Sequence, residues 1–199
     1  YLQQEKIIRA PEFSFNRLRN DLPKFYALAL DTIWDAAKTD GREVVADGYG
    51  HAHTAELAMG KAVGETLERY TLTLYRRSEL RRATYNDLAR RSTAALDPGT
   101  LNNFLPWQKE RYSRFVRSAD SPIRWVEARS LDGDPMLVPA QHVYWNYEFA
   151  HDQEEPMLLQ PTTSGAGAHF TRDEAILSGL LEMIQRDGFL IFWLNKLTP

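Results

Sequence analysis

The stretch Thr162–Phe189, "TTSGAGAHFTRDEAILSGLLEMIQRDGF", decides the fold because a loop of small residues leads directly into a long helical pattern. Thr171, followed three positions later by Glu174, fits a capping box, which marks the start of a helix. Three polar side chains then follow within two turns: Glu182, Gln185 and Arg186. A helix that starts behind glycines presents backbone N–H groups and a positive dipole end, so this stretch is suited to bind phosphate.

The same arrangement occurs earlier in the chain, at an offset of 117 residues that places Glu65 on Glu182. At this offset "DGYGH" (residues 47–51) matches "SGAGA" (residues 164–168). The helices match as well: Thr54 with Thr171, Glu68 with Gln185, and Arg69 with Arg186. The sequence therefore predicts an internal pseudo-repeat of a Gly-x-Gly loop, a threonine cap and a Glu-bearing helix.

The remaining pattern mixes helices and strands, so we expect an α+β fold with mixed sheets packed with helices. "KFYALALDTIWDAA" (residues 24–37) is interpreted as a helix, and a second helix is expected from Thr54 to about Tyr75. Residues 123–145, "IRWVEARSLDGDPMLVPAQHVYW", predict two strands joined by an Asp-Gly turn. "FLIFWL" (residues 189–194) is most simply a core segment.

The first of the repeated helices is expected to bury one apolar face and to carry its polar residues opposite. At 3.6-residue spacing the apolar face holds Met59, Val63, Leu67, Tyr70 and Leu74. The polar stripe holds Lys61, Glu65, Glu68 and Arg69, and its counterpart on the second helix holds Ser178, Glu182, Gln185 and Arg186. Carboxylates of this kind suit Mg²⁺, a hard cation that takes oxygen ligands and usually keeps a phosphate partner.

Two simpler readings of these residues stay open. Pairs such as Glu65–Arg69 and Glu182–Arg186 stand four residues apart, a spacing that commonly decorates solvated helix faces. Gene duplication without retained chemistry would also explain the repeat.

His51 and His53 could begin a zinc site, although no third ligand lies nearby in the sequence. The arginine-rich residues 76–117 favour a solvated surface over a guide for an acidic peptide.

The composition excludes several classes of protein. The 199 residues contain no cysteine, which excludes disulfides, thiolate metal sites and cysteine nucleophiles. The formal net charge is −3, so the charge does not indicate a nucleic-acid or membrane-surface partner. Neither a signal-peptide pattern nor an apolar run long enough for a bilayer is visible, and a cytoplasmic location is the expectation.

At its two helices the sequence resembles the YcaO family. The family's small-residue loop and following helix are similar to Thr162–Phe189, and its earlier "GExxER" helix is similar to "AMGKAVGETLERY" (residues 58–70). The strand "VPAQHVYW" (residues 138–145) also resembles the family's habitual "VPA" strand. The likeness runs from about Val44 to the C-terminus. It implies an enzyme that uses ATP and Mg²⁺ to phosphorylate the oxygen of a peptide backbone amide.

In the azole-forming members of that family, a Cys, Ser or Thr side chain attacks the activated carbonyl carbon, and phosphate leaves as the azoline ring closes. The resemblance implies a cyclodehydratase whose substrate is a ribosomally made precursor peptide and whose partner is a leader-peptide-binding protein. Oligomeric state stays open, a homodimer included. Thioamide formation and a non-catalytic docking module remain alternatives.

The resemblance also assigns the cofactor site residue by residue, whereas it leaves the catalytic residues unknown. ATP-binding residues are expected at Glu65, Glu68, Glu174, Ser178, Glu182, Gln185 and Arg186. Of these, Glu65, Glu68, Glu182 and Gln185 would hold Mg²⁺, and Arg186 would contact phosphate.

Three features depart from the family pattern. Gln185 stands where the family has Glu, and Tyr49 stands where many relatives have Lys between two glycines. The family continues well past the end of this sequence, into residues that include a proline-rich tail in azole-forming enzymes. We therefore expect residues 1–40 to be a lead-in segment and residues 41–199 to be a partial YcaO domain, inactive by itself.

Overall fold

A computed structural model of the chain describes residues 4, 8, 16–17, 26–32, 39, 41, 44, 46–101, 105–111, 119–145, 147, 155–158 and 161–197. Their helices and strands form an α+β fold, as the sequence predicts. The chain divides into two compact units. The first combines Tyr1–Ala36, Glu43–Leu72 and Thr163–Pro199, and the second combines Ala37–Arg42 and Thr73–Thr162.

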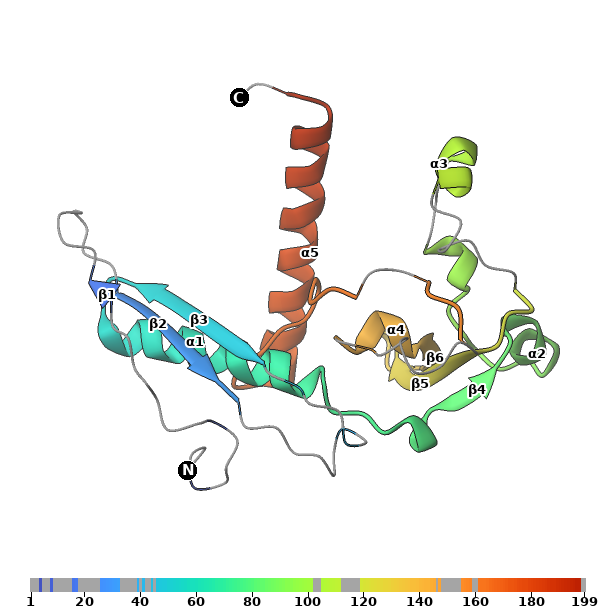
Figure 1. Cartoon of the computed structure of the whole chain (residues 1–199), viewed down its shortest axis with the longest axis horizontal. Helices are drawn as coiled ribbons and strands as arrows, with labels where there is room; N and C mark the ends of the chain where they lie inside the picture. The colour runs from blue at the N-terminus through green and yellow to red at the C-terminus, as the bar shows by residue number, and fades with distance from the viewer. Residues whose placement is uncertain are drawn as a thin grey trace. The chain divides into compact units, whose positions relative to one another are not determined.

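The first unit contains a three-stranded antiparallel sheet in the order β1 (Asn16–Arg17), β2 (Tyr26–Asp31) and β3 (Asp47–Ala52), shown in Figure 1. The helix expected over residues 24–37 is therefore wrong for Tyr26–Asp31. Alanine and leucine favour helices locally, but pairing along the full length of β3 outweighs that preference. Two strands of the expected lead-in segment thus join a sheet with β3, while the boundary at residue 40 stays a prediction.

Helix α1 (Ala55–Thr71) packs closely on β3 because β3 carries two glycines. A Cβ atom on Gly50 would lie 1.8 Å from the carbonyl oxygen of Ala58, and one on Gly48 would lie 2.3 Å from the backbone nitrogen of Thr66. The first Gly-x-Gly is therefore part of a strand and not the expected loop. Glycine is needed here because two backbones approach one another without room for a side chain.

The buried face of α1 differs from the predicted apolar stripe. Its buried residues are Ala58, Ala62, Thr66 and Tyr70, whereas Met59 and Val63 are only partly buried, beside Ile8. Small side chains face β3 because the close approach leaves no space for large ones. The polar stripe is consequently not opposite the buried face. Glu65 and Arg69 lie next to it and contact β3.

Two glycine substitutions test this packing. We expect Gly50→Ala to lower the free energy of unfolding by about 3 kcal/mol, since the new methyl group overlaps the backbone of α1. Gly60→Ala is the matched control, because a Cβ atom on Gly60 meets nothing within 4 Å. At that exposed helical position, alanine should stabilise the protein by about 0.5–1 kcal/mol. Urea unfolding of both variants measures the difference, and equal destabilisation would contradict the close approach.

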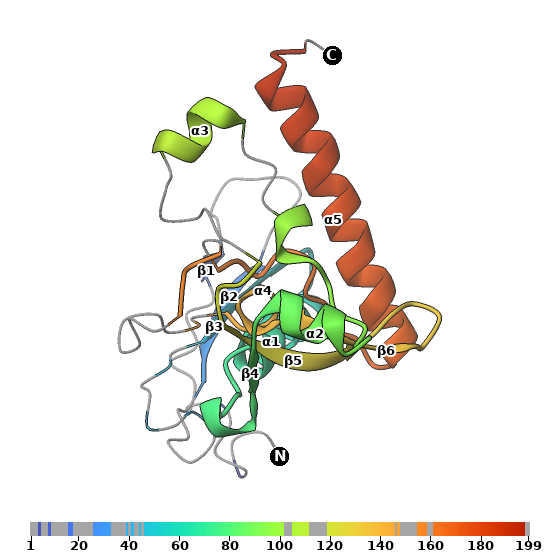
Figure 2. The ribbon, with the colours of Figure 1, turned by 90° about the vertical axis from the view of Figure 1, so that its right-hand side faces the viewer.

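Helix α5 (Arg172–Leu194) repeats this packing against the loop before it, and it runs unbroken along its length (Figure 2). A Cβ atom on Gly167 would lie 2.2 Å from the carbonyl oxygen of Ala175 and 2.9 Å from the nitrogen of Gly179. Gly165 has a φ of +86°, a left-handed conformation that favours glycine. The contacts of Gly167 correspond to those of Gly50 at the offset of 117 residues, whereas a duplication as their origin stays a prediction.

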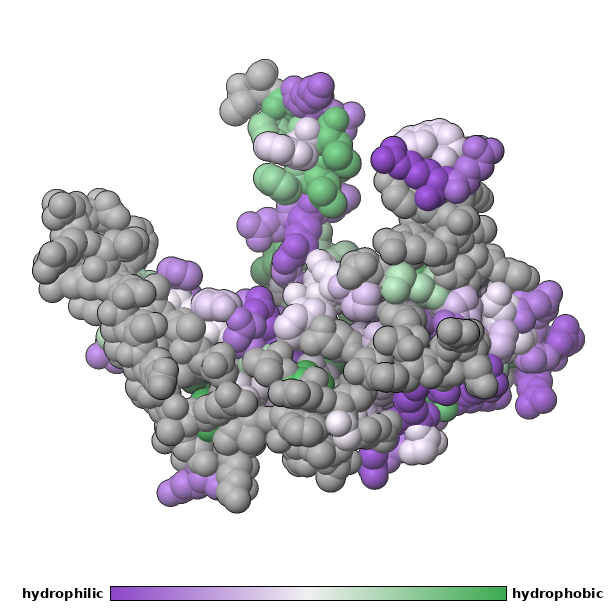
Figure 3. Space-filling model, in the orientation of Figure 1, coloured by the Kyte–Doolittle hydropathy of each residue, from purple (hydrophilic) through white to green (hydrophobic). Residues whose placement is uncertain are grey.

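The C-terminal half of α5 exposes a large apolar surface, which Figure 3 shows as a hydrophobic patch over that end of the helix. Residues 189–194 are between 38% and 73% exposed. The expectation that "FLIFWL" is a core segment is therefore wrong for this structure, because no other described element packs along it. In the described part of the chain, no helix has both the length and the hydropathy required to cross a membrane.

The second unit is built on the antiparallel sheet β4 (Arg81–Ala83), β5 (Ile123–Arg129) and β6 (Pro135–Pro139). The β5–β6 hairpin confirms the predicted Asp-Gly turn, with Gly133 at a φ of +92°. Helical segments complete the unit: 3₁₀ helices η2 (Arg77–Glu79) and η3 (Pro98–Thr100), and α-helices α2 (Tyr85–Arg90), α3 (Pro106–Arg111) and α4 (Ala140–Val143). Its core consists of Leu88, Ile123, Trp125, Leu137 and Leu158.

His142 on α4 should make the stability of the second unit depend on pH. Its Nδ1 atom is buried, and the described residues give it no hydrogen-bond partner. Burial lowers the pKa of His142 from 6.5 to about 4. Between these two values the unfolded chain binds a proton that the folded chain does not, so acidification favours unfolding.

We therefore expect the unfolding free energy of the second unit to fall by about 1–2 kcal/mol between pH 6.5 and pH 4. This value is smaller than the full pKa shift implies, because the ring is partly exposed and solvent screens its charge. Urea unfolding across this pH range measures the slope. In His142→Gln the slope should be shallower, while His51→Gln, at an exposed histidine of β3, should keep it. An unchanged slope in His142→Gln would contradict the assignment.

Candidate functional site

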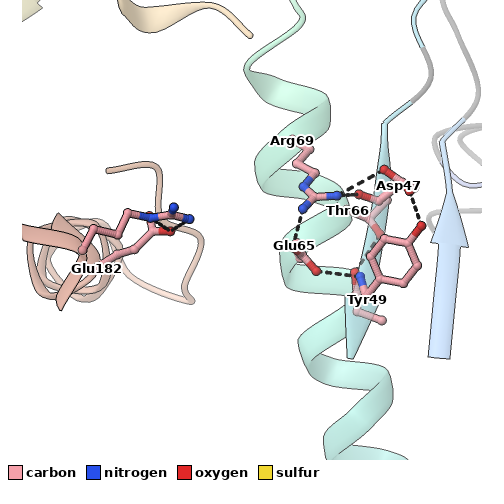
Figure 4. A network of polar contacts seen from close by, with 8 residues as sticks. Asp47, Tyr49, Glu65, Thr66, Arg69 and Glu182 are labelled. Carbon is pink, nitrogen blue, oxygen red and sulfur yellow. Dashed lines mark hydrogen bonds and ion pairs between the residues drawn. The ribbon is translucent and has the colours of Figure 1, made fainter. Parts of the chain in front are cut away.

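The candidate site starts at Glu65 on α1, whose carboxylate is held from two sides (Figure 4). The backbone N–H of Tyr49 donates to Glu65 Oε2 at 2.6 Å, and Arg69 Nη2 donates to Glu65 Oε1 at 2.7 Å. Tyr49 lies between the two glycines of β3, so the close strand–helix packing brings its amide to Glu65. Backbone geometry and one ion pair thus fix this carboxylate.

Asp47 completes the contacts around Glu65, and sequence reasoning missed it. Arg69 Nη1 donates to the Asp47 carbonyl oxygen at 2.9 Å and to Asp47 Oδ1 at 3.1 Å. The hydroxyl of Tyr49 donates to Asp47 Oδ2. Asp47 and Arg69 are 22 residues apart and on different elements, so no periodic pattern links them. Only its place directly before the Gly-x-Gly could have drawn attention to Asp47.

Glu182 on α5 is held in a similar way. The backbone N–H of Gly165 donates to Glu182 Oε2 at 3.0 Å. Arg186 Nε and Nη2 both donate to Glu182 Oε1, at 2.8 and 2.7 Å. In both helices a carboxylate therefore binds the backbone of the preceding Gly-x-Gly and the arginine one turn further on.

Glu68 connects the two helices. Burial raises the pKa of Glu68, and the nearby carboxylates of Glu182 and then Glu65 raise it further, while a hydrogen bond from the Ala168 backbone lowers it. Glu68 therefore lies within electrostatic reach of one carboxylate on each helix, Glu65 on α1 and Glu182 on α5. A divalent cation would relieve the repulsion among them.

The other predicted site residues lie on α5 with different surroundings. Glu174 accepts hydrogen bonds from the Thr171 hydroxyl at 2.7 Å and from His169 Nδ1 at 2.8 Å. The Thr171 bond, followed by the His169 bond, lowers the pKa of Glu174. Thr171 Oγ1 in turn accepts the Glu174 N–H at 3.3 Å and so caps α5 as predicted. Ser178 and Gln185 are exposed, and neither side chain bonds to any described residue.

The oxygen-rich donor set fits Mg²⁺, although it does not form a complete cage. Within the described residues, no three His, Cys, Asp or Glu side chains are placed to hold one metal ion together. The zinc alternative at His51 and His53 thus gains no third ligand there. Mg²⁺ is usually bound by one or two carboxylates plus substrate phosphates, so an incomplete protein cage is compatible with a nucleotide-bound magnesium ion.

Comparison with known proteins gives the chain its family. Residues 49–199 match the family model described as YcaO cyclodehydratase, ATP- and Mg²⁺-binding. An uncharacterized protein of Methanothermobacter thermautotrophicus is 30% identical over 155 residues, which cover 77% of this chain and 35% of that protein. This chain thus spans about a third of the length of that relative.

Solved structures agree in fold. YcaO from Methanopyrus kandleri, bound with AMPPCP and Mg²⁺, has a TM-score of 0.65 at 19% identity, over 100% of this chain and 43% of that one. A heterocyclase in complex with substrate and cofactor has a TM-score of 0.64 at 20% identity, over 96% of this chain and 28% of that one. The heterocyclase TruD has a TM-score of 0.55 at 24% identity, over 71% and 21%. Because the matched residues make up most of its sequence, this chain belongs to the YcaO family.

Proposed function

We propose that this chain carries Mg²⁺- and ATP-binding residues of an enzyme that activates a peptide backbone amide by O-phosphorylation. The product would be azolines formed by cyclodehydration of Cys, Ser or Thr residues in a ribosomal precursor peptide. One observation carries the proposal: Glu68 on α1 lies within electrostatic reach of Glu182 on α5 and of Glu65 on its own helix. Such a cluster is costly without a cation, and Mg²⁺ with a nucleotide supplies one.

The carboxylates of Glu65 and Glu182 retain capacity for a metal. A carboxylate offers about four acceptor positions. Glu65 uses one position on each oxygen, for Tyr49 and Arg69. Glu182 uses two positions on Oε1 for Arg186 and one on Oε2 for Gly165. The backbone N–H groups thus orient both carboxylates while leaving oxygen positions open.

Arg186 is the residue proposed to contact phosphate. Its side chain is 52% exposed, and among the described residues it bonds only to Glu182. A guanidinium that turns from Glu182 to a phosphate oxygen would exchange one charged partner for another. That movement would also free both positions on Glu182 Oε1 for the metal. Arg186 can therefore couple phosphate binding to metal binding.

Bound Mg²⁺-ATP would supply the phosphoryl group and the charge neutralisation that make an amide oxygen a leaving group. The chain's own residues would orient it: one or two of the carboxylates of Glu65, Glu68 and Glu182 through the metal, and Arg186 through phosphate. Glu174, Ser178 and Gln185 stay predicted contacts. The solved relatives support the assignment, since one is bound with AMPPCP and Mg²⁺ and another is in complex with substrate and cofactor.

The proposal also includes a substrate, a partner protein and a cellular location. The substrate would be a precursor peptide, delivered by a leader-peptide-binding partner protein in the cytoplasm. A second candidate function is that of a non-catalytic docking module, which is favoured by the exposed Gln185 in place of a carboxylate. Thioamide formation uses the same activation and remains an alternative product.

Calorimetric titration of ATP into the full chain, with Mg²⁺ and with EDTA, tests the proposal. We expect binding that requires Mg²⁺ and that weakens in Arg186→Ala. Arg91→Ala, at an exposed arginine of the second unit, is the matched control and should bind as the wild type does. Metal-independent binding, or none in the folded full chain, would overturn the nucleotide assignment and leave the docking module.

Gln185→Glu is expected to raise the affinity for Mg²⁺ in the presence of nucleotide by roughly three- to tenfold, because it restores a charged oxygen ligand. Titration of Mg²⁺ at fixed ATP measures the change. Gln185→Ala removes the side-chain amide and so shows whether the amide oxygen itself contributes to binding. This variant should bind Mg²⁺ slightly more weakly than the wild type does. If Gln185→Glu weakens Mg²⁺ binding, residue 185 is not a metal ligand.

A further inference from the structure

We propose that Asp47 is a positioning residue for the metal site, which acts through Arg69 to hold the carboxylate of Glu65 in place. The inference rests on the proposed function, because it concerns the same site. Neither the family description nor the predicted ligand set includes Asp47. The geometry that points to it is a closed set of contacts between β3 and α1 (Figure 4).

Arg69 is held by Asp47 as well as by the carboxylate that it orients. It donates to Asp47 twice, at the carbonyl oxygen and at Oδ1, and once to Glu65 Oε1. The Arg69 side chain is only 23% exposed. A charged pair that is shielded from water in this way is stronger than a surface pair. Arg69 is therefore a fixed bridge between a strand and the proposed metal ligand.

Tyr49 closes the contacts from the other side. Its hydroxyl donates to Asp47 Oδ2, and its backbone N–H donates to Glu65 Oε2. The guanidinium of Arg69 lies 6.0 Å from the centre of the Tyr49 ring, within the range of a cation–π contact. Both oxygens of Glu65 are thus tied, directly or through Arg69, to residues 47–49 of one strand. The direction in which Glu65 presents its open positions follows from that strand.

The second helix provides an internal comparison. At the offset of 117 residues the position of Asp47 is occupied by Ser164, which has no carboxylate. Arg186 correspondingly bonds only to Glu182 among the described residues and is 52% exposed. Arg69 and Arg186 are therefore expected to have different roles. Asp47 fixes Arg69 as a support for Glu65, whereas Arg186 stays free to reach a phosphate.

Removal of Asp47 should affect metal binding more than nucleotide binding. In Asp47→Ala, Arg69 keeps one backbone oxygen and Glu65 but loses its charged anchor. Loss of a residue that orients a metal ligand typically costs about 10- to 100-fold in metal affinity. Asp47→Asn keeps an oxygen that can accept from Arg69, so its loss should be only about threefold.

The test is the Mg²⁺ concentration that gives half-maximal ATP binding by the full chain. We expect it to rise about 10- to 100-fold in Asp47→Ala, with ATP affinity at saturating Mg²⁺ changed less than about threefold. Asp87→Asn, which removes the charge of an aspartate paired with Arg90 in the second unit, is the matched control and should match wild type. Thermal unfolding confirms that each variant is folded. If Asp47→Ala does not fold, the same measurement is made on Asp47→Asn.

A double-mutant cycle separates positioning from general destabilisation. If Asp47 acts through Glu65, Asp47→Ala should add almost nothing in a Glu65→Gln background. The inference would be overturned if Asp47→Ala caused the same loss of Mg²⁺ affinity in the Glu65→Gln background as in the wild type. It would also be overturned if a folded Asp47→Ala variant had an unchanged Mg²⁺ requirement. Neither result would contradict the proposed function. A folded wild type that shows no Mg²⁺-dependent ATP binding would overturn the proposed function, and with it this role of Asp47.

Discussion

Glu155→Ala should destabilise the second unit by about 3–5 kcal/mol, because it removes the buried carboxylate that pairs with the largely buried Arg124. Glu155 is almost fully buried and accepts hydrogen bonds from four donors. The donors are the backbone N–H and Nη1 of Arg124, Nε2 of Gln141 and the hydroxyl of Tyr147. The network joins β5 to the segment 155–158, where the N–H of Leu158 donates to Gln141 Oε1 at 2.8 Å.

Hydrogen exchange at the β5 and β6 amides, followed with urea unfolding, measures this loss. Glu127→Ala is the matched control, because Glu127 is an exposed glutamate of the same strand that bonds to no described side chain. It should change stability by less than about 0.5 kcal/mol. Equal effects of the two substitutions would mean that the Glu155 network contributes little. The pKa of Tyr147, which burial and then Glu155 raise, should fall in Glu155→Ala.

Glu182→Ala should weaken Mg²⁺-dependent ATP binding by roughly 100-fold or more, since loss even of a supporting residue costs 10- to 100-fold. The substitution removes a proposed metal ligand and the partner of both the Gly165 N–H and Arg186. Calorimetric titration of ATP at saturating Mg²⁺ measures the loss.

Asp187→Asn provides the control on the same helix, because Asp187 is exposed and bonds to no described residue. It should bind Mg²⁺ and ATP as the wild type does. If both variants lose affinity equally, the effect is one of charge along α5 and not of coordination. If Glu182→Ala binds normally, the proposed metal site lies elsewhere.

The sequence was sufficient to predict the elements that local chemistry specifies. The threonine caps of α1 and α5 follow from side chains that reach backbone donors within one turn. The β5–β6 hairpin follows from an Asp-Gly pair that tolerates positive φ. Glu65 and Glu182 were singled out because one offset relates the residues around them, and the structure places each against the backbone of its own Gly-x-Gly; their role as ligands stays a prediction.

Features that depend on distant contacts could not be predicted in this way. Residues 26–31 have a helix-favouring composition, and only pairing with β3 makes them a strand. The helix face of Ala58, Ala62 and Thr66 is buried because two glycines of another element lie against it. Asp47 is linked to Glu65 only through Arg69, a relation that no spacing within one element contains.

The most direct test of the central claim is a paramagnetic NMR measurement with Mn²⁺ and ATP on the full chain. Mn²⁺ replaces Mg²⁺ at oxygen-rich sites, and it broadens the amide signals of nearby residues. If both helices hold one metal–nucleotide complex, the amides of Tyr49 and Gly165, which donate to Glu65 and Glu182, should broaden together and only when ATP is present. Broadening near one helix alone, or near neither, would contradict a site shared by α1 and α5.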